Sequence, residues 1–254
     1  MCGRYGLNVD ANDLMRVYQA IGRDIEEWTP RYSVAPSNTV PILIALPGEL
    51  PAEIPAPQEP AAARTREPAV ARALEPAVWG FRPFWAKEGR PRPINARLET
   101  VATNGMFRSS FRAHRAIVPM TGYYEWTPGP GRTKIPHWIH ADGALLHAAA
   151  VTTSCRSEEG EARTVAIVTT TGTDRAGEIH DRMPVFMTAD CLDDWLAPGK
   201  LEPQEGEELV HLAADQARRV ASSLSSYRVS PRVNSVARID PHDPTLIDPA
   251  ETLF

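Results

Sequence analysis

The opening stretch MCGRYG places a cysteine at position 2 of the chain. The small side chain of Cys2 permits removal of Met1, after which Cys2 carries a free α-amine and a thiol on adjacent carbons. In small peptides the amine has a pKa of ~7.7–8.0 and the thiol one of ~8.5, so both reactive forms exist near neutral pH. An internal cysteine lacks the amine, and a terminal serine lacks the thiol. The alternative is that Cys2 is a buried small apolar residue, the usual state of a free cysteine.

Three other short stretches place reactive side chains among apolar or turn residues. Asn95 lies in INARLET, Glu125 in GYYEW and His180 in IHDRMP. Each also has a structural explanation: a helix N-cap for Asn95, a solvent-exposed strand position for Glu125, and a polar residue before a turn for His180. Because side chains alternate along a strand, Glu125 is expected on the face opposite Tyr124 and Trp126.

In their order along the chain, the stretches MCGRY, WGFRPFW, NARLET, GYYEW and HDRMP resemble the motifs of the SOS-response-associated peptidase family. These are abasic-site-processing proteins that crosslink to damaged DNA. The resemblance covers nearly the whole chain, from Cys2 to the C-terminal strand. It implies a sensor of abasic sites in single-stranded DNA that shields the lesion as a covalent DNA–protein crosslink. The sugar aldehyde would condense with the Cys2 amine, and the thiolate would then close a thiazolidine.

The resemblance also implies a role for each motif residue and two further activities, AP-lyase cleavage and autoproteolysis as a peptidase or hydrolase. Asn95 would hold the amine and the sugar, Glu125 would move protons at the amine, and His180 would act on the sugar oxygen. The arginines would contact phosphates and the tryptophans would stack on bases. The DNA-contact residues implied in this way are Arg4, Trp79, Trp85, Arg97, Trp126, Thr169 and Arg182. No metal and no cofactor is expected.

The formal net charge of −5 is unevenly distributed. Between Phe81 and Arg115, eight basic residues stand against two acidic ones, which is a local net charge of +6. Such a basic island indicates a phosphate-binding surface, although a solvated face with internal salt bridges would look the same. Three widely spaced cysteines without a CxxC pair argue against a disulfide framework or a structural zinc site. With no membrane span and no secretory signal in the sequence, we expect a cytoplasmic monomer.

The elements that must position these residues follow from the apolar pattern. Residues 10–28 show helical spacing behind a capping Asn8 or Asp10, and residues 40–46 predict a strand. Several short strands follow between residues 115 and 188, with short helices before and longer ones after them. This arrangement predicts an α+β fold with an antiparallel, barrel-like β-sheet core and peripheral helices. We expect one domain over residues 1–240 with a flexible Pro/Ala-rich insertion at about 47–76, and a C-terminal tail over 241–254.

Three other functions remain open at this level. An N-terminal-nucleophile glutamine amidohydrolase also begins Met-Cys-Gly and uses its terminal amine as the base for its own thiol. That interpretation leaves GYYEW, HDRMP and the basic island unexplained. A non-covalent single-stranded DNA binding module would form no adduct with abasic DNA. A thiol protease that acts on other proteins is the third alternative.

Overall fold

The computed structural model describes residues 2–46, 70–86, 89, 92–157 and 160–250. The strands are β1 (Tyr5–Leu7), β2 (Ile21–Gly22), β3 (Arg31–Val34), β4 (Thr39–Ala45), β5 (Arg72–Trp79), β6 (Asn95–Arg97), β7 (Arg115–Met120), β8 (Gly122–Pro128), β9 (Lys134–His140), β10 (Leu146–Ser157), β11 (Gly160–Thr171), β12 (Arg182–Pro184), β13 (Phe186–Met187) and β14 (Ser225–Arg228). The helices are α1 (Ala11–Tyr18), α2 (Leu98–Val101), α3 (Arg108–Ala113), α4 (Asp174–Ile179), α5 (Leu192–Leu196) and α6 (Pro203–Ala221). Short 3₁₀ turns are η2 (Ala189–Cys191), η3 (Pro231–Asn234), η4 (Val236–Arg238) and η5 (Pro244–Ile247).

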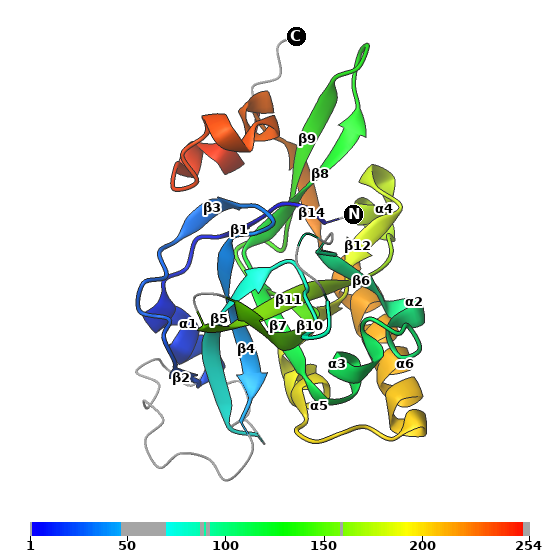
Figure 1. The fold of residues 1–254 in the computed structure, drawn as a ribbon. Helices are drawn as coiled ribbons and strands as arrows, with labels where there is room; N and C mark the ends of the chain where they lie inside the picture. The colour runs from blue at the N-terminus through cyan, green and yellow to red at the C-terminus, as the bar shows by residue number, and fades with distance from the viewer. Residues whose placement is uncertain (1, 47–69, 87–88, 90–91, 158–159, 251–254) are drawn as a thin grey trace, which may run out of the picture.

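The larger sheet closes on itself as a barrel. Its strands follow the order β12-β11-β10-β7-β4-β5-β2, and β11 also pairs with β5 in parallel through Thr164↔Val78 and Val165↔Trp79. The strands β5, β4, β7, β10 and β11 therefore form a ring, which removes the exposed sheet edges that these strands would otherwise present. Helices α2, α3, α5 and α6 gather on one side of this ring and α1 lies on the other (Figure 1). The α+β fold with a barrel-like core and peripheral helices is confirmed.

The second sheet carries the N-terminus. Its five strands follow the order β14-β9-β8-β1-β3, so β1 lies between β8 and β3. The face of β8 that holds Tyr124 is covered by a separate apolar cluster that includes Trp138, Val233 and Leu246. Leu246 is fully buried although it belongs to the segment expected to be a tail.

The helix predicted over residues 10–28 is shorter than expected. Asp10 caps its start by accepting a hydrogen bond from the Asp13 amide, but the helix ends at Tyr18. Gln19 adopts a left-handed backbone conformation (φ 48°), and the chain then forms β2, which pairs with β5. Ile25 is still buried, because the turn returns the chain to the same core. Hydrogen bonding to a neighbouring strand therefore overrides the helical spacing.

The insertion predicted at about 47–76 is partly wrong. Residues 47–69 lie outside the described residues, but β5 begins at Arg72. Arg72 is buried and paired with Asp193 at 2.6 Å, and Pro76 faces Pro41 across the β4–β5 pair. The high proline and alanine content of residues 47–76 is typical of a flexible segment, so the start of this strand was not predicted. No helix in the described part of the chain is long and apolar enough to cross a membrane.

Candidate active site around Cys2

Cys2 is completely buried where the N-terminal segment enters the core. The segment continues into β1, which pairs with β8 through Tyr5↔Tyr123. Asn95 reaches the same point from β6 and donates a hydrogen bond from Nδ2 to the backbone carbonyl of Cys2 at 2.9 Å. Asn95 is the first residue of β6. It does not cap a helix, because the N-cap position of α2 is occupied by Arg97.

Glu125 is buried within β8, with 3% of its surface exposed. Strand alternation places Tyr124 toward the C-terminal apolar cluster, so Glu125 shares the opposite face with Tyr123. Glu125 therefore does not take the solvent-exposed position that is usual for a glutamate in a strand. A buried carboxyl group requires compensating interactions, and this makes Glu125 a candidate for proton transfer.

The electrostatics of this site couple Cys2 to Glu125. Burial raises the pKa of the Cys2 thiol well above its ordinary value, and the negative charge of Glu125 raises it further. The amino terminus and the Arg4 amide oppose this shift. Burial also raises the pKa of Glu125, while the amino terminus and His180 lower it. The thiol is therefore protonated at neutral pH, and Glu125 lies within electrostatic range of Cys2, the amino terminus and His180.

His180 joins the site from the segment between α4 and β12. It is the residue after α4, and β12 begins two residues later. The Arg182 amide donates to His180 Nδ1 at 3.0 Å, and the same nitrogen lies 2.7 Å from a carboxylate oxygen of Asp181. Either contact orients the imidazole through Nδ1: without a proton Nδ1 accepts from the Arg182 amide, and with a proton it donates to Asp181. The structure thus brings Cys2, Asn95, Glu125 and His180 into one neighbourhood from four distant parts of the chain.

A basic rim lies beside this neighbourhood, along β11. Thr169 pairs with Arg97 of β6 on one edge of β11, and Thr171 pairs with Arg182 of β12 on the other. Arg97 is exposed. Arg182 makes a two-pronged ion pair with Glu99 at 2.8 and 2.9 Å and donates to the Thr169 carbonyl at 2.6 Å. Partial burial raises the pKa of Glu99, but the hydrogen bonds and charge of Arg182, the backbone amide of Glu99 and the Thr170 hydroxyl together outweigh it and hold that pKa below its ordinary value.

The remaining predicted DNA-contact residues differ in exposure. Trp85 is 57% exposed, whereas Trp79 is fully buried and packs against Tyr5. Trp126 is half-buried and donates from its indole nitrogen to Asn234 at 2.7 Å. Thr169 is buried in the β11 ladder. For these buried positions the described geometry is that of packing, and contact with DNA stays a prediction.

Arg4 is also buried, and its guanidinium serves the fold. It donates to the Ser33 hydroxyl at 3.0 Å and to the Val233 carbonyl at 3.2 Å. The residue therefore ties β3 and the C-terminal segment to the stretch that carries Cys2. Burial lowers the pKa of Arg4, because the charged form is less favourable in the protein interior than in water. Its predicted phosphate contact is untested.

The basic island of the sequence is not one surface. Arg115 is buried, and its guanidinium donates to the carbonyls of Phe111, Arg112, Trp195 and Ala197. Arg115 therefore holds α3 and α5 together, and its charge is not presented to DNA. The charge of the sequence could not show this, because an arginine that binds backbone carbonyls in the interior and one that faces solvent cannot be told apart by residue type.

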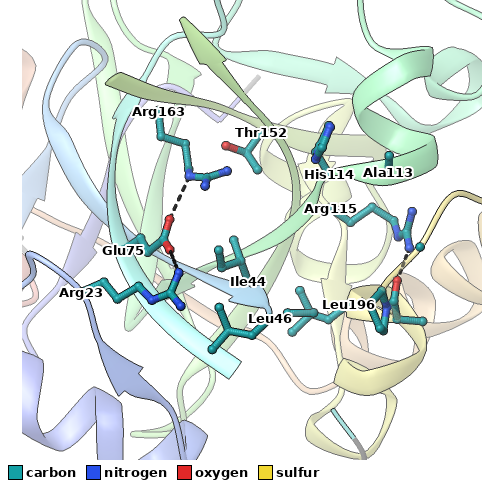
Figure 2. A pocket seen from close by; sticks show the side chains of 14 residues that line it. Arg23, Ile44, Leu46, Glu75, Ala113, His114, Arg115, Thr152, Arg163 and Leu196 are labelled. Carbon is teal, nitrogen blue, oxygen red and sulfur yellow. Dashed lines mark hydrogen bonds and ion pairs between the residues drawn. The ribbon is translucent and has the colours of Figure 1, made fainter. Parts of the chain in front are cut away.

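Arg115 also borders a recess of about 300 Å³ that contains none of the predicted site residues. Figure 2 shows Glu75 there between Arg23 and Arg163, with ion pairs of 3.2 and 3.0 Å. The two cations neutralise one carboxylate, and the donors of Arg115 already bind carbonyls. The chemistry of this recess is thus accounted for by internal contacts, and the Cys2 neighbourhood remains the candidate site.

Sequence reasoning missed several residues at the site. Tyr5 and Tyr123 are paired across β1 and β8 and lie within electrostatic range of Cys2. Glu99 pairs with Arg182. The signal for Tyr123 was available, since it stands two residues before Glu125 in GYYEW and so shares its face. Glu99 lies inside INARLET, but only the fold brings it to Arg182. Within the described residues, no group of His, Cys, Asp and Glu side chains could hold a metal ion.

Comparison with known proteins gives a consistent result. A family model described as SOS response associated peptidase (SRAP) matches residues 1–236. The chain is 29% identical over 248 residues to the abasic site processing protein YoqW of Bacillus subtilis, covering 95% of this chain and all of that one. It is 30% identical to YoaM of the same organism, covering 94% and 98%. It is 29% identical to YedK of Escherichia coli, covering 84% and 86%.

Solved structures support the fold. A crystal structure of a protein from Bacteroides thetaiotaomicron superposes with a TM-score of 0.74 at 22% identity, covering 98% of this chain and 100% of the other. A phage-related protein of Bordetella bronchiseptica gives a TM-score of 0.61 at 25% identity, covering 90% and 94%.

Proposed function

Because this chain belongs to the SOS response associated peptidase family, we propose that it senses abasic sites in single-stranded DNA and attaches to them covalently through Cys2. The observation that carries the proposal is the arrangement around Cys2, where Asn95 binds its carbonyl and Glu125 acts electrostatically on its thiol. The similarity to abasic site processing proteins over most of the chain supports the same substrate class.

The proposed reaction requires a free Cys2 amine, and so follows removal of Met1. The amine nitrogen attacks the aldehyde carbon of the ring-opened sugar, and loss of one water leaves an imine. The thiol sulfur then adds to the imine carbon while the nitrogen takes up a proton, which closes a five-membered thiazolidine. The raised pKa of the buried thiol supports this order, because the thiol is protonated at neutral pH and the amine attacks first.

Glu125 and His180 would divide the proton transfers. Glu125 lies within electrostatic range of Cys2, and its raised pKa moves it toward the neutral range in which an acid–base group is effective. His180 is oriented through Nδ1, so Nε2 is the nitrogen that would meet the sugar oxygen. Asn95 would keep the terminal residue in place by its hydrogen bond to the Cys2 carbonyl.

DNA would reach Cys2 across the rim on β11. Arg97 and Arg182 supply cations at neighbouring positions of β6 and β12, and arginine suits bidentate phosphate contacts. Trp85 offers an exposed ring on which a base could stack. Trp126, Thr169, Arg4 and Trp79 would support this surface from beneath or at its margin.

Two associated activities follow from the same chemistry. An imine acidifies the neighbouring sugar carbon, so strand cleavage by β-elimination, an AP-lyase reaction, would accompany attachment. Removal of Met1 by the protein itself would be a peptidase reaction and would generate the reactive terminus. We further propose that the protein acts as a cytoplasmic monomer with one processing domain over residues 1–240, without metal or cofactor.

The test uses a single-stranded oligonucleotide in which excision of one uracil leaves an abasic site. The wild-type protein is expected to form an adduct that survives heat and detergent. Cys2→Ser should lose the stable adduct because an oxazolidine hydrolyses easily, and Cys2→Ala should give only a borohydride-trappable imine. Cys155→Ser is the matched control and should behave as wild type. A stable adduct in both Cys2 variants would exclude the thiazolidine, and ammonia release from free glutamine would instead favour an amidohydrolase.

A further inference from the structure

Two tyrosine side chains meet in the core beside Cys2. Tyr5 of β1 and Tyr123 of β8 are directly opposite each other in the antiparallel pair, so their side chains lie on the same face of the sheet. Both side chains are completely buried. The ring of Tyr5 contacts Trp79 at 5.3 Å between centroids, and the ring of Tyr123 contacts Phe186 at 5.7 Å. These aromatic contacts fix the rings and therefore the positions of the hydroxyl groups.

Neither hydroxyl group has a hydrogen-bond partner among the described residues. Burying a hydroxyl without a partner is unfavourable, and native structures rarely tolerate it without a reason. Other buried tyrosines of the same chain do have partners. The Tyr18 hydroxyl lies 2.8 Å from His147 Nδ1, and the Tyr124 hydroxyl donates to the Tyr32 carbonyl at 2.8 Å. Among the buried tyrosines that the structure describes, the lack of a partner is thus particular to Tyr5 and Tyr123.

A third buried polar atom without a partner in the described part of the chain belongs to the same site. It is Oδ1 of Asn95, whose Nδ2 binds the Cys2 carbonyl. Tyr123 also shares a strand face with Glu125, two residues further along β8. A charge on Cys2 raises the pKa of both tyrosines in addition to the effect of burial, which agrees with this placement. Two tyrosine hydroxyl groups within electrostatic range of Cys2, and the amide oxygen of Asn95, therefore have unused hydrogen-bonding capacity.

We infer that the hydroxyl groups of Tyr5 and Tyr123 bind the aldehyde oxygen of the abasic sugar during imine formation, an inference that rests on the proposed function. The amine nitrogen forms a bond to the aldehyde carbon, the carbonyl electron pair moves to oxygen, and the oxygen gains a proton from nitrogen by way of Glu125. The carbon–oxygen bond then breaks, the oxygen leaves with a second nitrogen-bound proton as water, and the nitrogen lone pair completes the imine.

During these reaction steps the tyrosine hydroxyl groups donate hydrogen bonds to the aldehyde oxygen as its negative charge develops. Both hydroxyl groups remain protonated throughout. Such preorganised donors are effective because the site excludes water before the reaction begins. Asn95 Oδ1 can accept a hydrogen bond from the departing water. The two tyrosines would accordingly act on the first covalent step and not on DNA binding.

The experiment compares Tyr5→Phe, Tyr123→Phe and the double variant with wild type in three measurements. Single-turnover imine formation, trapped with borohydride, is expected to slow ~10-fold or more in each single variant and ~10²-fold in the double variant. Affinity for an oligonucleotide carrying a tetrahydrofuran site, which has no aldehyde, should be unchanged. The thermal midpoint should stay equal or rise, because a buried hydroxyl without a partner has been removed.

Tyr18→Phe is the matched control, a buried tyrosine away from Cys2. It should lower the thermal midpoint by leaving His147 without its partner, with no change in the rate. Unchanged imine formation in the Tyr5 and Tyr123 variants, or a rate loss matched by a lower midpoint, would overturn the inference. If wild type itself forms neither imine nor adduct, the proposed function fails instead.

Discussion

Asn95 Nδ2 donates a 2.9 Å hydrogen bond to the backbone carbonyl of Cys2, which joins two residues 93 positions apart in the chain. The contact holds Cys2 at the position where its amine would react once Met1 is removed. Asn95→Asp keeps the shape but removes the donor. We expect slower adduct formation and a free energy of unfolding lower by about 1–3 kcal/mol, since the Cys2 carbonyl then faces an acceptor. Asn104→Asp at an exposed position is the control, and equal effects of both changes would contradict this role.

Glu125→Gln should stabilise the fold at neutral pH while it impairs the reaction. Burial raises the pKa of Glu125, so the folded state binds its proton more readily than the unfolded state does. The stabilising contribution of such a group is present at low pH and is lost as the pH rises through the folded-state pKa. Urea unfolding at pH 7 should therefore give a higher free energy of unfolding for Glu125→Gln than for wild type.

The gain should shrink as the pH falls through the folded-state pKa and vanish below about 4.3, where the carboxyl is protonated in both states. Adduct formation by Glu125→Gln should be slower by ~10²-fold or more, with DNA affinity unchanged. Glu207→Gln, at an exposed position of α6, is the matched control and should change neither quantity. A less stable Glu125→Gln protein at pH 7 would show that the carboxylate is held by favourable pairing.

Glu99 limits the charge that Arg182 presents to a phosphate. The two side chains form a two-pronged ion pair, and only 13% of the Arg182 side chain is exposed. We expect Glu99→Gln to tighten binding of single-stranded DNA several-fold at low salt, with the gain disappearing as salt screens the rim. Titrations at a series of salt concentrations test this, with Glu178→Gln of the exposed Arg175 pair as control. Weaker binding by Glu99→Gln would mean that Glu99 mainly orients Arg182.

Substitution of Trp85 should affect DNA binding, whereas substitution of Trp79 should affect the stability of the fold. Trp85 is 57% exposed beside the still more exposed Phe84, so Trp85→Ala should weaken single-stranded DNA binding by about 1–3 kcal/mol and leave unfolding unchanged. Trp79 is fully buried with its indole nitrogen bound to the Ile94 carbonyl at 3.0 Å, so Trp79→Ala should lower the free energy of unfolding by about 3–5 kcal/mol. Unchanged DNA affinity in Trp85→Ala would remove that residue from the interface.

Much of the fold follows from local pattern, because apolar runs bounded by turn residues mark most strands. The strand predicted at residues 40–46 lies almost entirely in β4. What local pattern could not give is the closure of the barrel, since the β11–β5 pair joins segments that differ widely in sequence position. The early end of α1 has the same origin, because pairing of β2 with β5 is a tertiary contact.

For the candidate site too, some features could be predicted from the sequence and others could not. The face of Glu125 was predictable from strand alternation, and the structure places it on the face opposite Tyr124. The burial of Arg4 and Arg115 was not, because each binds a backbone carbonyl from a distant segment, Val233 for Arg4 and Trp195 for Arg115. The Glu99–Arg182 pair also depends on β6 and β12 lying on either side of β11.

Intact mass of the protein before and after mixing with an abasic oligonucleotide shows whether Cys2 attaches to the lesion. Before mixing, the mass should be that of the chain without Met1, and after mixing it should be that of a single adduct, the sum of protein and DNA less one water. Peptide mapping should place the DNA on Cys2, and Cys2→Ala should give no stable adduct. An adduct on a lysine, or an unmodified protein in the presence of aldehyde-bearing DNA, would contradict attachment through Cys2.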